Sequence, residues 1–281
     1  MNPLSLQTER EFDFNDDDFK LIARIVFEKT GIHLAPHKKN MVYSRIAKRI
    51  RRLNLNSFSE YCTLITSNND GGEMMDFINA VTTNLTHFFR EIHHFKHLAE
   101  AALPEAIKQN SSFKRLRIWS AGCSSGMEAY SIAMTLRSVL KDVDNWDAKI
   151  LATDIDTNML AKGSAGIYSD EEYENIPAKF REEFITKDSK NSQIKVSDKL
   201  KKLVSFKRLN FIEPWPVKGP FDIVFCRNVV IYFQKETQKK IFENFSNVMR
   251  SGSHLYIGHS ENLTGISNKF QLIGKTIYQK I

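Results

Sequence analysis

The sequence predicts an α/β protein in which an all-helical N-terminal domain precedes a doubly wound, Rossmann-like sheet. Apolar residues follow helical periodicity up to Thr82, whereas strands alternate with helices in the second half of the chain. A lysine-rich stretch with short alternating apolar runs, at about 184–207, predicts a small β subdomain within the sheet domain. We therefore expect a helical domain over 1–82, a linker and connecting helix over 83–112, and the sheet domain over 113–281.

Composition limits the class of protein. The 281 residues are 42% hydrophobic, which is typical of a chain that buries a core. Apolar runs stay well short of the roughly 20 residues that span a bilayer, so we expect a cytoplasmic protein without direct membrane insertion. Three widely spaced cysteines predict reduced thiols. The net charge of +7 predicts an anionic partner, which could be nucleic acid, a membrane surface or an acidic protein.

Helix signals organise the N-terminal domain. A first helix, apolar at Phe19 and Ile22, should stop at Gly31, and a second should begin near Pro36 and end near Leu53. A third should start at the capping-box sequence of residues 57–60, and a fourth should cover residues 73–81.

Periodicity also places the elements of the sheet domain. A connecting helix should run from about Glu91 to Gln109, with a break near Pro104. The predicted strands are Leu116 to Ser120, Lys149 to Thr153, Phe221 to Cys226, His254 to Gly258 and Lys275 to Gln279. The predicted helices between them are Met127 to Leu140, Thr157 to Lys162 and Lys235 to Arg250.

A loop of small residues, 121–126, follows the first predicted strand. In a doubly wound fold this loop can bring its backbone close to a ligand, although it could equally be a tight turn. Asp154, at the end of the second strand, is placed to accept hydrogen bonds from a ribose. The alternative is a helix N-cap, a role for which Asp156 or Thr157 is better placed.

Polar side chains mark the linker between the two domains. Asn84, Thr86 and Arg90 could cover one side of a ligand site, because domain interfaces often hold ligands. The alternative is a capped helix start with a surface arginine. Phe88 and Phe89 are expected in the core.

Two histidine-containing segments invite a catalytic or metal-binding interpretation. The spacing of His93, His94 and His97 could put two imidazoles on one helix face, but no carboxylate or cysteine completes a convincing ligand set, so we expect packing and helix-surface roles and no metal. Residues 259–261 read His-Ser-Glu and are expected to form a loop, because no nucleophile motif accompanies them.

Two long motifs carry a family resemblance. Residues 84–91 read Asn-Leu-Thr-His-Phe-Phe-Arg-Glu, and residues 225–233 read Phe-Cys-Arg-Asn-Val-Val-Ile-Tyr-Phe. Through them the chain resembles the CheR family of chemotaxis-receptor glutamate methyltransferases, which have a class I methyltransferase sheet. The resemblance implies S-adenosylmethionine as cofactor and S-adenosylhomocysteine as product. It also implies a cofactor pocket formed by Asn84, Thr86, Arg90, Glu128, Asp154, Asn210, Phe211, Asn228 and Val229.

The same resemblance implies a reaction. The expected activity is methyl esterification of specific glutamate side chains in the cytoplasmic helical region of chemotaxis receptors, for sensory adaptation. Arg90 would orient the incoming carboxylate, and Tyr232 would form a wall or donate a hydrogen bond near the methyl group. One departure concerns residues 126–131, where the family usually has Gly-Glu-Glu-Pro-Tyr-Ser. Met127 and Ala129 replace a carboxylate and a proline here, which could alter cofactor affinity.

The second predicted helix carries a basic stripe. The apolar residues of this helix fall on one side, and acids are absent from the sequence between Gly31 and Ser59. The stripe is either a solvated face or, as the resemblance implies, the surface that binds the acidic receptor. Its residues are Lys38, Arg45, Lys48, Arg49 and Arg52.

The resemblance leaves some choices open. Family members that bind a receptor C-terminal peptide tend to have a glycine in the β subdomain, and this chain has none between Ile167 and Gly219, so we expect independence from that peptide. The rival functions are a nucleic-acid methyltransferase and a non-catalytic adaptor that binds S-adenosylmethionine. We expect no nucleic-acid partner and a monomer.

Overall fold

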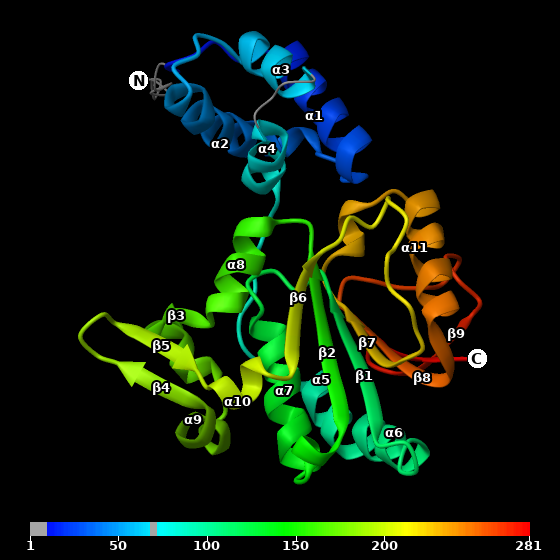
Figure 1. Ribbon diagram of the computed structural model, residues 1–281. Helices are drawn as coiled ribbons and strands as arrows, with labels where there is room; N and C mark the ends of the chain where they lie inside the picture. Colours follow the sequence, from blue (N-terminus) through cyan, green and yellow to red (C-terminus); the bar gives the residue numbers. More distant parts are fainter. Residues whose placement is uncertain (1–9, 68–71) are drawn as a thin grey trace, which may run out of the picture. The chain divides into compact units, whose positions relative to one another are not determined.

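The computed structural model describes residues 10–67 and 72–281. The chain divides into two compact units, Met1–Thr82 and Thr83–Ile281 (Figure 1). The change from helical to alternating sequence patterns coincides with this division. The connecting helix belongs to the second unit.

The first unit is helical, as its sequence predicts. Asn15 caps the first helix, and Gly31 ends it with a left-handed φ of 73°. The Ser57 side chain accepts the Glu60 N–H at 3.1 Å, but the Glu60 carboxylate bonds the N–H of Asn56, so only half of the predicted capping box forms. The elements are α1 (Asp16–Thr30), η1 (Pro36–Lys38), α2 (Lys39–Arg52), α3 (Phe58–Thr66) and α4 (Glu73–Val81).

The core of the second unit is a seven-stranded sheet with the order β6-β2-β1-β7-β8-β10-β9. The strands from β6 to β8 run parallel, and β10 is antiparallel to both of its neighbours. The strands are β1 (Arg115–Ala121), β2 (Asp147–Asp154), β6 (Val204–Arg208), β7 (Phe221–Cys226), β8 (Met249–Ile257), β9 (Phe270–Gly274) and β10 (Ile277–Lys280).

The order of strands creates a switch point. From β1 the chain adds β2 and β6 on one side of the sheet, and then returns to add β7 and β8 on the other side. The loops after β1 and β7 therefore leave the sheet in opposite directions, and in such sheets the crevice between them binds ligands. The predicted doubly wound fold is confirmed, and it places the candidate site at the carboxyl ends of β1, β2 and β7.

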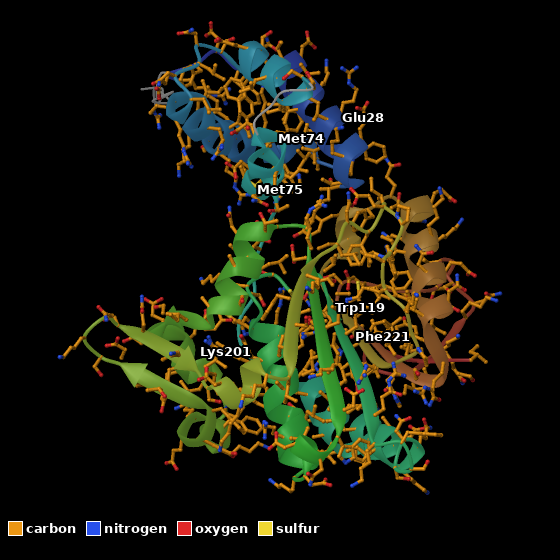
Figure 2. All side chains as sticks on the ribbon, in the orientation of Figure 1. Glu28, Met74, Met75, Trp119, Lys201 and Phe221 are labelled. Atoms are coloured by element: carbon orange, nitrogen blue, oxygen red, sulfur yellow. The ribbon has the colours of Figure 1, made fainter. Side chains whose placement is uncertain are left out.

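Helices pack on the sheet through alternating strand residues. Leu116 and Ile118 belong to a core cluster with residues of α5, α6 and α7. Trp119 contacts Phe245 of α11 at 5.2 Å between ring centroids and Phe221 at 5.1 Å (Figure 2). Successive side chains of β1 thus pack against helices on opposite faces of the sheet, because side chains alternate between the two faces along a strand. The main helices are α5 (Ile92–His97), α6 (Leu103–Gln109), α7 (Met127–Val139), α8 (Thr157–Ala165) and α11 (Lys235–Val248).

The connecting helix is irregular where the sequence places a break. A π-helical segment, η2 (Leu98–Ala102), separates α5 from α6, and Pro104 lies in the first turn of α6. Proline has no N–H and collides with the preceding turn, so the irregularity falls on its N-terminal side.

The β subdomain differs from its predicted extent. A three-stranded sheet of order β3-β5-β4 is built from β3 (Ile167–Ser169), β4 (Ile185–Asp188) and β5 (Gln193–Val196). The prediction that residues 203–206 belong to it is wrong, because β6 (Val204–Arg208) pairs with β2 in the main sheet. Because β6 is an edge strand with one neighbour, several of its side chains are exposed. Its sequence therefore alternates between apolar and polar residues, as that of a surface insert would. Short helices η4 (Asp170–Asn175), α9 (Ala178–Phe184) and α10 (Asp198–Lys201) complete the region.

Across the described residues, no helix combines the length and apolar character that crossing a membrane requires.

Candidate functional site

The loop after β1 turns through several left-handed residues. Gly122, Ser124 and Gly126 all have left-handed φ values, of 79°, 49° and 83°. A Cβ on Gly122 would lie 2.4 Å from Cγ2 of Val229, a residue that follows β7. Glycine is therefore required at position 122 both by its backbone and by the close approach of the two loops.

Asp154 ends β2 beside this loop. Its carboxylate accepts the Ser124 N–H at 2.7 Å and the Asp156 N–H at 2.9 Å. Burial raises its pKa to about 6. The helix that follows is capped by Asp156, which accepts from Asn158 and Met159, so the alternative role of Asp154 as an N-cap is wrong.

Asn84 anchors the linker to the same region. Its side-chain amide donates to Asp156 at 2.6 Å, and its carbonyl accepts the Ser124 hydroxyl at 3.0 Å. The first residue of the linker motif thus binds the loops after both β1 and β2. Phe88 and Phe89, predicted as core residues, are 1% and 6% exposed.

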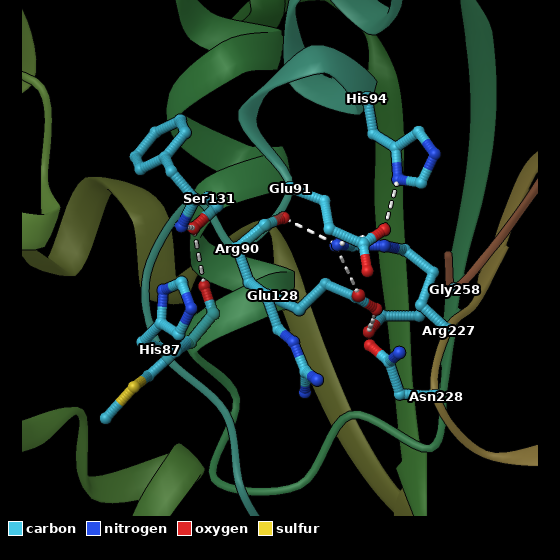
Figure 3. A network of polar contacts seen from close by, with 12 residues as sticks. His87, Arg90, Glu91, His94, Glu128, Ser131, Arg227, Asn228 and Gly258 are labelled. Carbon is cyan, nitrogen blue, oxygen red and sulfur yellow. Dashed lines mark hydrogen bonds and ion pairs between the residues drawn. The ribbon is translucent and has the colours of Figure 1, made fainter. Parts of the chain in front are cut away.

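A buried arginine joins the two family-like motifs. The Arg227 guanidinium donates to the Arg90 carbonyl at 2.6 Å and lies 3.1 Å from a carboxylate oxygen of Glu91 and of Glu128 (Figure 3). Glu128 also accepts the Ser120 hydroxyl at 2.6 Å. Burial raises the pKa of Glu128, and Arg227 opposes that rise. Sequence reasoning did not assign Arg227 a role, although it lies within the second motif.

Glu91 lies between this arginine and two histidines. Burial alone would raise its pKa, but Arg227 and hydrogen bonds from His259 lower the pKa to about 2. His259 Nδ1 lies 2.8 Å from one Glu91 oxygen, and His94 Nδ1 lies 3.3 Å from the other. Burial lowers the pKa of His94 to about 3, so this imidazole is neutral at pH 7.

This arrangement changes the assessment of a metal site. The prediction that no carboxylate joins the histidines is wrong, because ligand atoms of Glu91, His93 and His94 lie within 4.8 Å of one another. Arg227 already places a positive charge 3.1 Å from Glu91, and that charge would repel a metal ion. The cluster therefore does not support metal binding.

Arg90 and Tyr232 come from different motifs. Burial raises the pKa of Tyr232, and the charge of Arg90 opposes that rise. Arg90 also donates to the Leu85 carbonyl at 2.8 Å, which folds its side chain back along the linker. Tyr232 ends the single 3₁₀ turn η5 (Val230–Tyr232) that follows β7.

The remaining predicted pocket residues lie around the same strand ends. Asn228 and Val229 follow β7 directly and are half-buried, as Thr86 is in the linker. Asn210 follows β6 and donates to Glu213 at 2.9 Å. The Phe211 ring contacts Phe233, with centroids 6.1 Å apart.

The basic stripe on α2 is less uniform than its sequence suggests. Arg45 donates to the carbonyls of Ala80 and Thr82, and Arg49 forms ion pairs with Glu73 and Asp76. The expectation that all five cations share one free face is therefore wrong for Arg45 and Arg49, which hold α4 against α2. Among the described residues, no acid lies within ion-pair distance of the remaining cations of the stripe, namely Lys38, Lys48 and Arg52.

Comparison with known families gives a match for each unit. The family model described as "CheR methyltransferase, all-alpha domain" matches residues 17–82, and "CheR methyltransferase, SAM binding domain" matches residues 84–279. This chain belongs to the CheR methyltransferase family. The second CheR domain is named for S-adenosylmethionine, and it contains every predicted pocket residue.

Relatives match this CheR protein over almost their whole length. A probable chemotaxis protein methyltransferase of Rhizobium etli is 43% identical, over 91% of this chain and 96% of the relative. The chemotaxis protein methyltransferase of Escherichia coli is 39% identical, over 98% and 94%. That of Borreliella burgdorferi is 34% identical over the full length of both chains. The predicted family, fold class and cofactor are thereby confirmed, and the protein is an S-adenosylmethionine-dependent methyltransferase.

Proposed function

We propose that this CheR protein methylates specific glutamate side chains in the cytoplasmic helical region of chemotaxis receptors, as part of sensory adaptation. The observation that supports the proposal is that the linker motif and the second motif meet in one network, in which Arg227 binds the Arg90 carbonyl and the Glu91 and Glu128 carboxylates. Arg90 of the first motif can hold a carboxylate, and Tyr232 of the second provides a half-buried phenol. Both adjoin the strand ends where a class I methyltransferase binds its cofactor.

The residues present fit S-adenosylmethionine. Asp154 accepts two backbone N–H groups, and a carboxylate has further lone pairs for the hydroxyls of a ribose. Glu128 offers a carboxylate to the amino-acid end, and Arg227 keeps it in place. Phe211 offers an aromatic ring, and Asn210, Asn228 and Val229 would complete the pocket. When bound, the cofactor supplies a methyl group on a positively charged sulfur.

The acceptor needs no general base. A glutamate with a pKa near 4.3 is already ionised at pH 7, so its oxygen can attack the methyl carbon directly. A carbon–oxygen bond forms, the carbon–sulfur bond breaks, and its electron pair stays on sulfur as the positive charge disappears. No proton is transferred.

Alignment is the remaining task for the protein. Arg90 would orient the carboxylate, while the Tyr232 ring or hydroxyl would restrict the approach to the methyl carbon. Correct positioning of two reactants can lower a barrier by roughly 7 to 11 kcal/mol. The Arg227 network supports this task because it fixes the Arg90 backbone against the second motif.

Transfer of a labelled methyl group tests the proposal. The wild-type chain, Arg90→Ala and Tyr232→Phe would be incubated with S-adenosylmethionine and either receptor-containing membranes or RNA. We expect base-labile label on receptor only, and at least a tenfold loss of rate in each variant, corresponding to about 1.4 kcal/mol. Arg137→Ala, at the far end of α7 and paired with Asp144, is the matched arginine control and should keep full activity.

Three outcomes would contradict the proposal. Preferential methylation of RNA would favour the nucleic-acid methyltransferase. Cofactor binding without transfer to either substrate would favour the non-catalytic adaptor. Normal single-turnover rates in both variants would remove Arg90 and Tyr232 from the mechanism.

A further inference from the structure

The turn after β8 brings a buried carboxylate beneath the second motif. The N–H of Glu261 donates to the Gly258 carbonyl at 2.9 Å, which folds the chain back on itself. Glu261 is only 6% exposed. Although it follows β8, its side chain ends under the backbone that leaves β7.

This carboxylate accepts four backbone N–H groups. One oxygen accepts from Val229 at 2.8 Å and from Val230 at 2.9 Å. The other accepts from Asn228 at 3.0 Å and from Gly258 at 2.5 Å. The four lone-pair positions of a carboxylate are thus all used for the backbone.

The backbone conformation explains why these N–H groups converge. Asn228 has a left-handed φ of 58°, and Val229 that follows is right-handed, with φ −119° and ψ −47°. Alternating left- and right-handed residues point successive N–H groups at one spot and form an anion-binding nest. Asparagine tolerates the left-handed conformation as a single residue, so the need for an anion arises from the convergence of buried N–H groups and not from backbone strain.

The nest also determines where pocket side chains lie. A Cβ on Gly258 would lie 2.3 Å from the Asn228 side-chain nitrogen, so Asn228 rests directly on the backbone of the Glu261 turn. Val229 packs against Gly122 of the loop after β1. The Tyr232 N–H donates to the Val229 carbonyl at 3.3 Å.

We propose that Glu261 is a positioning residue for methyl transfer, acting as the internal anion that holds the Asn228–Val230 backbone in its pocket-forming conformation. Glu261 need not touch cofactor or substrate, because it acts through Asn228, Val229 and Tyr232. The inference rests on the proposed function only for the roles of those three residues.

The test compares two substitutions, each of which replaces a buried carboxylate with the neutral amide of the same size and shape. Glu261→Gln keeps one acceptor oxygen and replaces the other with an NH₂ group. That group cannot accept hydrogen bonds from the backbone N–H groups that face it. Asp222→Asn does the same to a buried carboxylate at the start of β7, which accepts the Arg117 N–H at 2.7 Å. Both should lower the melting temperature. Only Glu261→Gln should weaken S-adenosylhomocysteine binding in calorimetry, on the order of tenfold to a hundredfold for lost buried hydrogen bonds.

Chemical rescue separates positioning from general destabilisation. Glu261→Ala leaves a space beside the nest, which formate or acetate can enter as a replacement anion. We expect either anion to recover S-adenosylhomocysteine affinity in Glu261→Ala, whereas chloride at the same ionic strength does not. Glu261→Gln, whose side chain still fills the space, should not respond.

Several results would overturn the inference. These are unchanged affinity in folded Glu261→Gln, an equal loss in Asp222→Asn, and no anion rescue. Hydrogen exchange tests the wild-type chain directly. The backbone amides of Asn228, Val229 and Val230 should exchange slowly before ligand is added. Rapid exchange of these amides would also refute the nest. Asn228→Ala with normal affinity would instead refute the proposed pocket role of Asn228 while leaving the nest intact.

Discussion

At the scale of single residues, the burial of Asp154 should make both stability and ligand affinity depend on pH. Its folded-state pKa of about 6 lies above the ordinary value near 3.9, so the folded protein holds an extra proton between these values. The contribution of this residue to stability is therefore full below about pH 4 and is lost as pH rises through 6. The ionised form is the better acceptor for hydroxyl groups.

We expect S-adenosylhomocysteine affinity to rise with pH through about 6 and then level off. Asp154→Asn should bind weakly and show no such step, because the amide does not titrate. Calorimetry on both sides of pH 6 measures the effect. The exposed Asp144→Asn should keep the wild-type profile, and a step that survives in Asp154→Asn would assign the titration to another group.

Gly122 supports a second prediction at this scale. Gly122→Ala adds strain at φ 79° and a methyl group 2.4 Å from Val229, whereas Gly252→Ala adds similar strain at φ 83° with no atom within 4 Å of the new methyl. Strain should cost each variant about 1–2 kcal/mol in the free energy of unfolding. Only Gly122→Ala should also weaken S-adenosylhomocysteine binding. Equal affinities by calorimetry would show that Val229 does not shape the pocket.

At the scale of elements, α2 carries two sets of cations that its sequence does not separate. Arg49 is 14% exposed at its side chain and binds Glu73, whose carboxylate also accepts the Tyr61 hydroxyl at 2.7 Å. Lys48 and Arg52 are exposed. One set of cations holds the helices together, and the other is the set that would attract the receptor under the proposed function.

Charge reversal should separate these sets. Arg49→Glu should cost about 3–5 kcal/mol in the free energy of unfolding, because it leaves the buried Glu73 carboxylate without its partner. Lys48→Glu and Arg52→Glu should stay within about 0.5 kcal/mol of wild type yet slow receptor methylation. Thermal unfolding and the labelled methyl assay measure the two effects. Normal receptor methylation by both exposed variants at low salt would exclude α2 as the docking element.

At the scale of the whole molecule, the net charge of +7 should govern encounter with an acidic partner. We expect kcat/KM for receptor to fall steeply as salt rises above about 0.1 M, where the screening length drops below about 10 Å. S-adenosylhomocysteine affinity should change little, because the residues of the proposed pocket are buried or half-buried and therefore weakly screened. If cofactor affinity fell in parallel, the salt effect would belong to the pocket and not to docking.

The sequence by itself determined those features that depend on neighbours along the chain. The end of the first helix at Gly31 and the strand leading to Asp154 follow from local periodicity and turn chemistry. The family and its cofactor followed from the motifs. These signals are local, so they survive without knowledge of the fold.

Only the tertiary structure decided which distant segments meet. It assigned β6 to the main sheet, paired Arg49 with Glu73, placed Glu91 beside Arg227 and brought Glu261 under Asn228. No local pattern encodes such pairs, because a carboxylate has the same sequence signature whether it faces solvent, an arginine or a nest of backbone N–H groups. Burial and long-range pairing, which require the folded chain, determine its role.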